Sequence, residues 1–112
     1  MKSALIASLL ISMAGGAAAE DTPNTQGEQI YNKWCAACHA AGDAYPGTLA
    51  LRAKYRGAVP DTLVERRDLN PELIKYYVRN GISVMPFFRK TEISDAELDA
   101  LANFLAKTPS AK

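Results

Sequence analysis

The sequence predicts a small all-α domain built from short helices. Two stretches begin with a helix-capping pattern and a third begins with Asn-Pro, and the apolar residues that follow recur at helical spacing. No stretch alternates apolar and polar residues as a half-buried strand would, and the chain has no internal repeat or low-complexity tract. Its 112 residues, 48% hydrophobic and 22% charged, fit one globular domain rather than a disordered tail, a fibre or a multidomain enzyme.

The first 19 residues have the pattern of a secretory signal peptide. Met1-Lys2 give a positive start, residues 4–12 a mostly apolar run, and residues 17–19 a small-residue cleavage site. The apolar run is shorter than the roughly 20 residues that a membrane-spanning helix needs. We therefore expect residues 1–19 to be cleaved, and residues 20–112 to form a periplasmic domain with no membrane span.

The charge of the chain is close to balanced. Cleavage removes Lys2 and no acidic residue, so the formal net charge falls from +1 to 0. A nucleic-acid partner would require a basic surface, which the composition does not provide.

The first predicted helix leads into the cysteines of the chain. Residues 20–24 are expected to be an extended leader, and Thr25 with Glu28 forms a capping box that opens a helix running into Cys35. Residues 41–61 are rich in glycine and proline, which predicts a loop with one helical turn near residues 50–55. A short helix is expected at residues 62–66.

Two longer helices are predicted in the second half. Asn70 is a favourable N-cap, Pro71 suits the first helical position, and Asn80-Gly81 ends the run. A second capping box opens the final helix, which stops before Pro109. Its two capping residues are Ser94 and Glu97, and its apolar face carries Leu98, Leu101 and Leu105.

Both cysteines and the single histidine of the chain occur together, as C-x-x-C-H at residues 35–39. This pattern attaches c-type haem: the thiols of Cys35 and Cys38 can each add to one vinyl group, and His39 can bind the iron. A thioredoxin-type dithiol would require a βαβ surrounding, a structural zinc site needs four ligands, and a disulfide would leave His39 unexplained. The sequence therefore predicts one covalent haem c.

Met85 is the one methionine outside the signal segment, and Pro86 follows it. A methionine in such a place more often packs in a core, but beside a haem it is predicted to be the second axial ligand. Filling both axial positions suits electron transfer. A haem peroxidase or gas-binding protein normally needs an open position, and no distal histidine is available, so these functions are the weakest alternatives.

The order of these features resembles the class I c-type cytochromes. The resemblance implies three to five short helices wrapped around one covalently attached haem, with the first and last helices crossing. It also implies that a proline carbonyl supports the second nitrogen of His39; Pro46 is the candidate, although Tyr-Pro-Gly replaces the usual Gly-Pro order. The residues that match the helix crossing are Gly27, Tyr31, Leu101 and Phe104.

A closer resemblance covers mainly residues 71–105. Residues 72–81 and 84–88 are similar to the cytochrome subunit of p-cresol methylhydroxylase and related flavocytochromes, including eugenol hydroxylase, and the specific parts are Val-Arg-Asn-Gly and Met-Pro. The resemblance implies an FAD-containing dehydrogenase or hydroxylase of phenolic substrates as electron donor, a downstream redox protein as acceptor, and no bond-making chemistry by the cytochrome. A freely diffusing periplasmic carrier to a terminal oxidase or another dehydrogenase is the alternative.

The charged residues are expected to lie mostly in solvent. Phe87 and Phe88, followed by Arg89-Lys90, form either an apolar contact surface with a basic rim or a ring packed on the haem beside solvated cations. Acidic residues near the last helix suit its dipole and need no partner. The cations expected to be solvated are Arg66, Arg67, Lys75 and Arg79, and the acids are Glu92, Asp95, Glu97 and Asp99.

Overall fold

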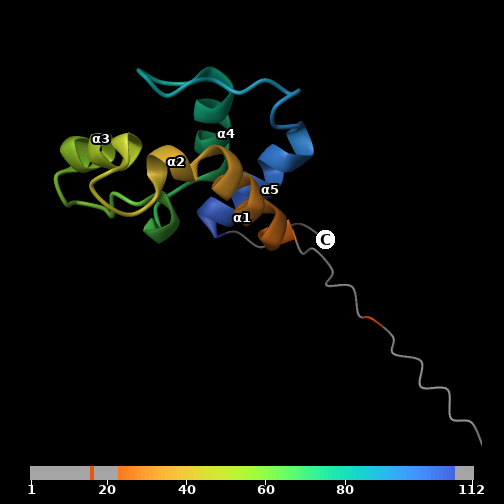
Figure 1. The fold of residues 1–112 in the computed structure, drawn as a ribbon, viewed down its shortest axis with the longest axis horizontal. Helices are drawn as coiled ribbons and strands as arrows, with labels where there is room; N and C mark the ends of the chain where they lie inside the picture. Colours follow the sequence, from red (N-terminus) through yellow and green to blue (C-terminus); the bar gives the residue numbers. More distant parts are fainter. Residues whose placement is uncertain (1–15, 17–22, 108–112) are drawn as a thin grey trace, which may run out of the picture.

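The structure, a computed structural model, describes Gly16 and residues 23–107, so most of the predicted signal segment and Pro109 lie outside the described residues. Within residues 23–107 the chain forms five α-helices and one 3-10 turn, and no strand. These elements confirm the predicted all-α fold of short helices (Figure 1). They are α1 (Pro23–Trp34), α2 (Ala36–His39), α3 (Pro46–Tyr55), η1 (Leu63–Glu65), α4 (Pro71–Asn80) and α5 (Asp95–Ala106).

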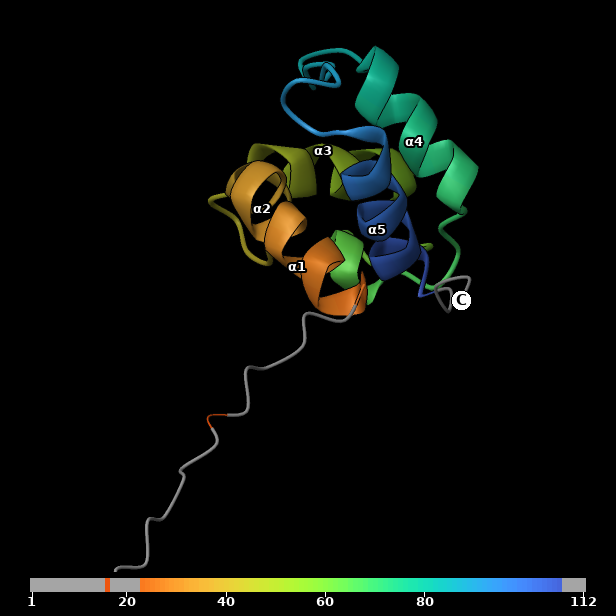
Figure 2. The same cartoon turned by 90° about the vertical axis from the view of Figure 1, so that its right-hand side faces the viewer.

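The first and last long helices, α1 and α5, pack against each other, as Figures 1 and 2 show from two directions. Gly27 lies at the crossing: a Cβ added there would meet the carbonyl oxygen of Ala100 and would lie 2.5 Å from Cβ of Phe104. The rings of Tyr31 and Phe104 lie 6.0 Å apart at the same contact. The predicted crossing is therefore confirmed, and a side chain at residue 27 would force the two backbones apart.

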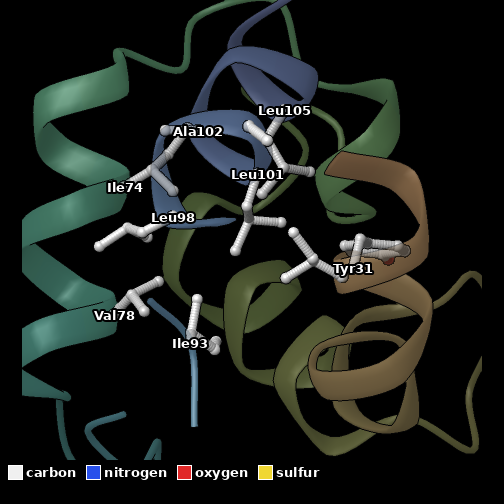
Figure 3. Packing of buried hydrophobic residues seen from close by; sticks show 10 residues of the cluster. Tyr31, Ile74, Val78, Ile93, Leu98, Leu101, Ala102 and Leu105 are labelled. Atoms are coloured by element: carbon white, nitrogen blue, oxygen red, sulfur yellow. The ribbon is translucent and has the colours of Figure 1, made fainter. Parts of the chain in front are cut away.

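The core lies between α5 and its neighbours. Leu98, Leu101 and Leu105 of α5 are buried against Ile74 and Val78 of α4, while α1 closes the opposite side (Figure 3). No helix among the described residues combines the length and the apolarity needed to cross a membrane.

Two of the three predicted helix starts are confirmed. The side chain of Asn70 accepts a hydrogen bond from the Glu72 N–H at 2.8 Å. At α5, Ser94 Oγ accepts from the Glu97 N–H at 3.2 Å and the Glu97 carboxylate accepts from the Ser94 N–H at 2.7 Å. These reciprocal bonds satisfy backbone donors that a helix start otherwise leaves without a partner.

The start of α1 was predicted too late. The helix begins at Pro23, so residues 23–24 are not extended and Thr25 lies inside the first turn rather than at the N-cap. Proline favours such a start because its ring fixes a helical φ and its missing N–H has no helical partner in any case.

The segment at residues 41–61 is also more helical than predicted. Instead of one turn near residues 50–55, α3 runs over ten residues from Pro46, with Gly47 inside it, and ends at Arg56 in the left-handed region. Gly47 weakens a helix intrinsically, but the space it leaves is needed by a neighbouring side chain described below. The short helix expected at residues 62–66 is the 3-10 turn Leu63–Glu65.

Candidate haem site

The C-x-x-C-H motif continues the helical path of α1 into the one-turn helix α2. The Cys35 N–H donates to the Tyr31 carbonyl at 2.8 Å, and the His39 N–H donates to the Cys35 carbonyl at 2.9 Å. Cys35 is half-buried and Cys38 is exposed, and both thiols are free. One turn of helix thus carries both cysteines and the histidine, the spacing that thioether attachment at one helix end requires.

The environment of the cysteines disfavours two of the three alternatives to haem attachment, a reactive dithiol and a zinc site. Burial, together with the neighbouring Cys38, raises the pKa of the Cys35 thiol to about 12, whereas reactive redox dithiols have a stabilised thiolate. Among the described residues no group of three or more His, Cys, Asp or Glu side chains could hold a metal ion, so a zinc site built from the motif lacks further ligands.

The imidazole of His39 lies half-buried against the start of α3. A Cβ added at Gly47 would lie 2.7 Å from Cε1 and 2.8 Å from Nδ1 of the ring, and 2.7 Å from the carbonyl oxygen of Cys38. Burial lowers the pKa of His39, which favours the neutral imidazole that can donate a lone pair to a metal. The glycine therefore provides the space in which the ring packs.

Two hydroxyl groups bind the backbone carbonyls of His39 and of the next residue, Ala40. Tyr31 donates a hydrogen bond to the His39 carbonyl at 3.0 Å, and the buried Thr48 donates to the Ala40 carbonyl at 2.7 Å. The sequence pattern predicted a role for Tyr31 in helix packing alone and predicted no role for Thr48. Neither hydroxyl belongs to a local pattern, because each donates to a residue eight positions away.

The support predicted from Pro46 stays a prediction. Pro46 begins α3 directly before Gly47 and is thus close in sequence to the residue that faces His39. The Nδ1 atom of His39 is buried and has no hydrogen-bond partner within the part of the chain that the structure describes. Burying a ring nitrogen without a hydrogen-bond partner costs free energy. No hydrogen bond from the described residues offsets this cost for Nδ1.

Met85 lies on a different segment, between α4 and α5. A two-residue turn fixes its backbone: the Met85 N–H donates to the Ile82 carbonyl at 2.9 Å, and the Ile82 N–H donates to the Met85 carbonyl at 3.2 Å. Ser83 in this turn has a φ of 54°, and the preceding Gly81 has a φ of 69°. A Cβ at Gly81 would lie 2.6 Å from the Met85 carbonyl oxygen, so glycine is required there for both reasons.

Apolar side chains around this turn are unusually exposed. Val84 is 91% exposed and Phe87 is 60% exposed, whereas Met85 between them is half-buried. Phe88 packs inward instead, with its ring 5.7 Å from that of Trp34, the residue directly before Cys35. The Met85 segment is thereby connected to the segment that carries the motif.

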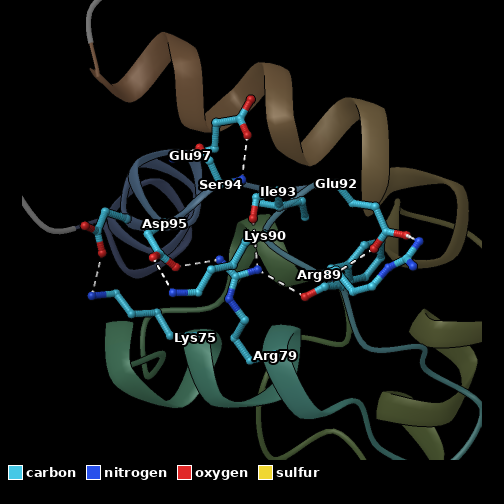
Figure 4. Close-up of polar contacts among 11 residues, drawn as sticks. Lys75, Arg79, Arg89, Lys90, Glu92, Ile93, Ser94, Asp95 and Glu97 are labelled. Carbon is cyan, nitrogen blue, oxygen red and sulfur yellow. Dashed lines mark hydrogen bonds and ion pairs between the residues drawn. The ribbon is translucent and has the colours of Figure 1, made fainter.

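Several ionic residues predicted to be solvated are in fact partnered. Arg79 has only 21% of its side chain exposed; it donates to the carbonyls of Phe88 and Ile93 and pairs with Asp95 (Figure 4). Arg66 is buried, lies 4.6 Å over the Tyr55 ring and pairs with Asp68, so its prediction was wrong as well. The side chains of the acids expected to need no partner also form contacts: Glu92 with Arg89, Asp95 with Lys90, Asp99 with Lys75, and Glu97 with the Ser94 backbone.

The described residues fit a covalently attached haem. They offer two free thiols and a neutral imidazole on one helical turn, and the buried Nδ1 atom of that imidazole has no hydrogen-bond partner among the described residues.

Comparisons with known proteins agree with this arrangement. The family model described as cytochrome c oxidase, cbb3-type, subunit III matches residues 22–105. Cytochrome c6 of Cyanidioschyzon merolae is 35% identical over 83 residues, covering 70% of this chain and 68% of the relative. The cytochrome c subunit of 4-cresol dehydrogenase [hydroxylating] of Pseudomonas putida is 31% identical over 98 residues, covering 88% of this chain and 74% of the relative.

A further relative, cytochrome c6 of Alaria esculenta, is 28% identical over 79 residues, covering 70% of this chain and 84% of the relative. No solved structure matches the chain. The family match covers most of the chain and includes the motif, the first and last helices and the Met85 segment. The chain therefore belongs to the class I c-type cytochromes, and it is a mono-haem electron carrier with covalently bound haem c.

Proposed function

We propose that this chain is the periplasmic cytochrome subunit of a complex with an FAD-containing dehydrogenase or hydroxylase of phenolic substrates. It would accept electrons one at a time from the flavin and pass each to a downstream redox protein, without catalysing a reaction itself. The observation that carries this proposal is the similarity to the cresol dehydrogenase cytochrome subunit, which extends over 88% of this chain, against 70% for the cytochrome c6 relatives.

In this proposal Cys35 and Cys38 form the two thioether bonds, and His39 and Met85 are the axial ligands. The iron of the bound haem supplies a centre that alternates between ferrous and ferric states. His39 suits its role because burial keeps it neutral and Gly47 and Tyr31 restrict its ring and backbone. Met85 suits its role because its backbone N–H and C=O are both bonded to Ile82 across a tight turn.

The axial role of Met85 is tested by removing its thioether. In Met85→Ala we expect the near-infrared band of a thioether bound to ferric iron to disappear, because no other methionine lies within residues 20–112. Val84→Ala is the matched control, since Val84 is the adjacent residue and is almost fully exposed, so its variant should keep the band. A band that persists in Met85→Ala would refute the assignment.

The exposed apolar residues beside Met85 supply a surface for the partner. Val84 and Phe87 leave apolar area in contact with water, and Arg89 lies two residues beyond Phe87 at the rim. A small apolar centre with a charged rim is typical of protein interfaces. Contact at this surface would bring the flavoprotein next to the segment that carries the axial methionine.

The partner is tested by co-expressing the chain with an FAD-containing protein encoded beside it. We expect a complex that retains both haem and flavin through gel filtration, and reduction of the cytochrome when a 4-alkylphenol is added anaerobically. Val84→Asp combined with Phe87→Asp should weaken this complex while leaving the haem spectrum unchanged. A chain that elutes without flavin and is not reduced by the phenolic substrate would refute the subunit assignment.

The second candidate is a freely diffusing carrier to an oxidase or another dehydrogenase. The cytochrome c6 matches favour it, because those relatives are not described as subunits of an enzyme. Both proposals share the same expectation that the signal segment is cleaved after Ala19 and that the protein is periplasmic. Mass spectrometry of the haem-loaded protein from a periplasmic fraction should give a chain that begins at Glu20.

A further inference from the structure

Residues 81–93 connect α4 to α5 without forming a helix, yet their backbone is held closely. The Phe88 N–H donates to the Val78 carbonyl at 2.7 Å, and the Phe88 carbonyl accepts from Arg79 Nη1 at 3.0 Å. Two consecutive residues of α4 therefore hold both polar backbone atoms of Phe88. The ring of Phe88 is fixed as well, because it packs edge-on against Trp34.

Arg79 makes further contacts beyond Phe88. The same Nη1 atom donates to the Ile93 carbonyl at 2.9 Å, and Nη2 pairs with Asp95 at 2.9 Å (Figure 4). One guanidinium thus connects α4 with the middle of the irregular segment, with its last part and with the first residue of α5. The planar guanidinium can donate in several fixed directions at once, which a lysine ammonium on a flexible chain does less well.

These contacts close residues 81–88, the first part of the segment, into a short loop. Its first end is Gly81, whose position is fixed by the end of α4 and by its close approach to the Met85 carbonyl. Its second end is Phe88, held by Val78 and Arg79. Met85 lies inside this loop, three residues before Phe88, so release of the second end would let the residues around Met85 move.

We propose that Arg79 is a positioning residue for the axial methionine: it fixes the loop that presents Met85 and thereby opposes the exchange of Met85 for another ligand. This inference rests on the proposed axial role of Met85. Arg79 need not touch the haem for this effect, since it acts on the backbone of Phe88 and Ile93. Without Arg79 these carbonyls lose a charged donor, and the loop can open at lower cost.

A neighbouring residue provides the control for general loss of helix packing. Lys75 lies one turn earlier on α4 and also connects this helix to α5, through an ion pair with Asp99 at 2.7 Å. Its side chain is 32% exposed, comparable with Arg79, and its ion-pair partners are Asp99 and Glu72, which lie outside residues 81–93. Lys75→Met therefore removes a connection between α4 and α5 without removing a donor to the loop.

The test is imidazole binding to the ferric, haem-loaded protein, followed through loss of the near-infrared methionine band. In Arg79→Met we expect imidazole to bind at least about tenfold more tightly than in wild type, which corresponds to about 1.4 kcal/mol. Lys75→Met should stay within about twofold of wild type. Asp95→Asn should also stay close to wild type, since it keeps both bonds from Arg79 to the carbonyls.

The outcomes separate this inference from the proposed function. If wild type shows no methionine band, or Met85→Ala retains one, then the axial assignment is wrong. If the assignment holds but Arg79→Met changes imidazole binding no more than Lys75→Met does, then Arg79 is only a packing residue and the inference is refuted. Should Arg79→Met fail to fold, Arg79→Lys is used instead, with an expected increase in affinity that again exceeds the change in Lys75→Met.

Discussion

Replacing Gly47 with alanine would place a methyl group between α3 and the imidazole of His39. The added Cβ would lie 2.7 Å from the Cys38 carbonyl oxygen, 2.7 Å from Cε1 of His39 and 2.8 Å from Nδ1. All three distances are well below ordinary carbon contacts of about 3.5–4.0 Å. One of the three atoms belongs to the backbone of the C-x-x-C-H motif, and the other two belong to the half-buried imidazole of His39, so none can move away freely.

Two effects of opposite sign decide how much Gly47→Ala changes the stability of the fold. Alanine is the better helix former, and inside a helix the exchange favours folding by about 1 kcal/mol at most. Overpacking of a closed contact costs about 1–3 kcal/mol. Because three atoms are approached at once, we expect the overpacking to exceed the gain and the variant to lose about 1–2 kcal/mol of stability.

The measurement is urea unfolding of the haem-loaded protein, followed by circular dichroism. Ala50→Gly is the control: Ala50 is exposed on the same helix, so its loss of about 1 kcal/mol reports helix propensity without any contact to His39. We also expect Gly47→Ala, but not Ala50→Gly, to alter the ferric absorption spectrum, because the histidine ring must shift. A Gly47→Ala variant that is more stable than wild type and has an unchanged spectrum would refute the packing argument.

The other two predictions concern the support of the motif and the start of α5. Tyr31→Phe should lower the free energy of unfolding in urea by about 0.5–1.5 kcal/mol, since the His39 carbonyl loses its donor; an equally stable variant would show that water replaces the hydroxyl at no cost. The Ser94 N–H and hydroxyl lower the pKa of Glu97, so its stabilisation is present above the unfolded pKa of about 4.3 and is lost as the pH falls through the lower folded value. The stability measured by urea unfolding should therefore decline below about pH 4, and less steeply in Glu97→Gln; an equal decline in both would contradict this role.

The helices were predictable where the start signal is local. Asn70 and Ser94 each satisfy a backbone donor two or three residues ahead, so the sequence pattern contains the whole interaction. The start of α1 was predicted wrongly because Thr25 and Glu28 have the residue types and spacing of a capping box. The helix in fact begins at Pro23, two residues before Thr25. A proline suits the first helical turn as well as a loop, and the sequence alone did not separate the two.

The C-x-x-C-H motif and Met85 could be singled out as candidates because their residue types are rare in this chain, with one histidine, two cysteines, and one methionine outside the predicted signal segment. The residues that support them were not found. Tyr31 and Thr48 donate to carbonyls eight residues away, and Arg79 donates to carbonyls nine and fourteen residues away. A backbone carbonyl carries no signature in the sequence, so a side chain that binds one looks the same as a solvated side chain until the fold is known.

The structure also explains the stretch that most resembles the flavocytochrome subunits. In Val-Arg-Asn-Gly, Val78 contributes a buried side chain and a carbonyl for Phe88, Arg79 holds the loop, and Gly81 adopts a positive φ close to the Met85 carbonyl. Three of the four residues thus act inside the domain, on the loop that presents Met85. Any cytochrome with the same loop would benefit from them, whichever protein reduces it.

The resemblance in this stretch therefore bears more directly on the loop that contains Met85 than on a particular partner. Specificity for a flavoprotein has to reside in side chains that the fold leaves exposed, and the candidates nearest to Met85 are Val84 and Phe87. These residues have no role in the described core, so they can change between carriers without loss of stability. The subunit and free-carrier proposals thus differ in the surface of the loop, while both share the Arg79 contacts beneath it.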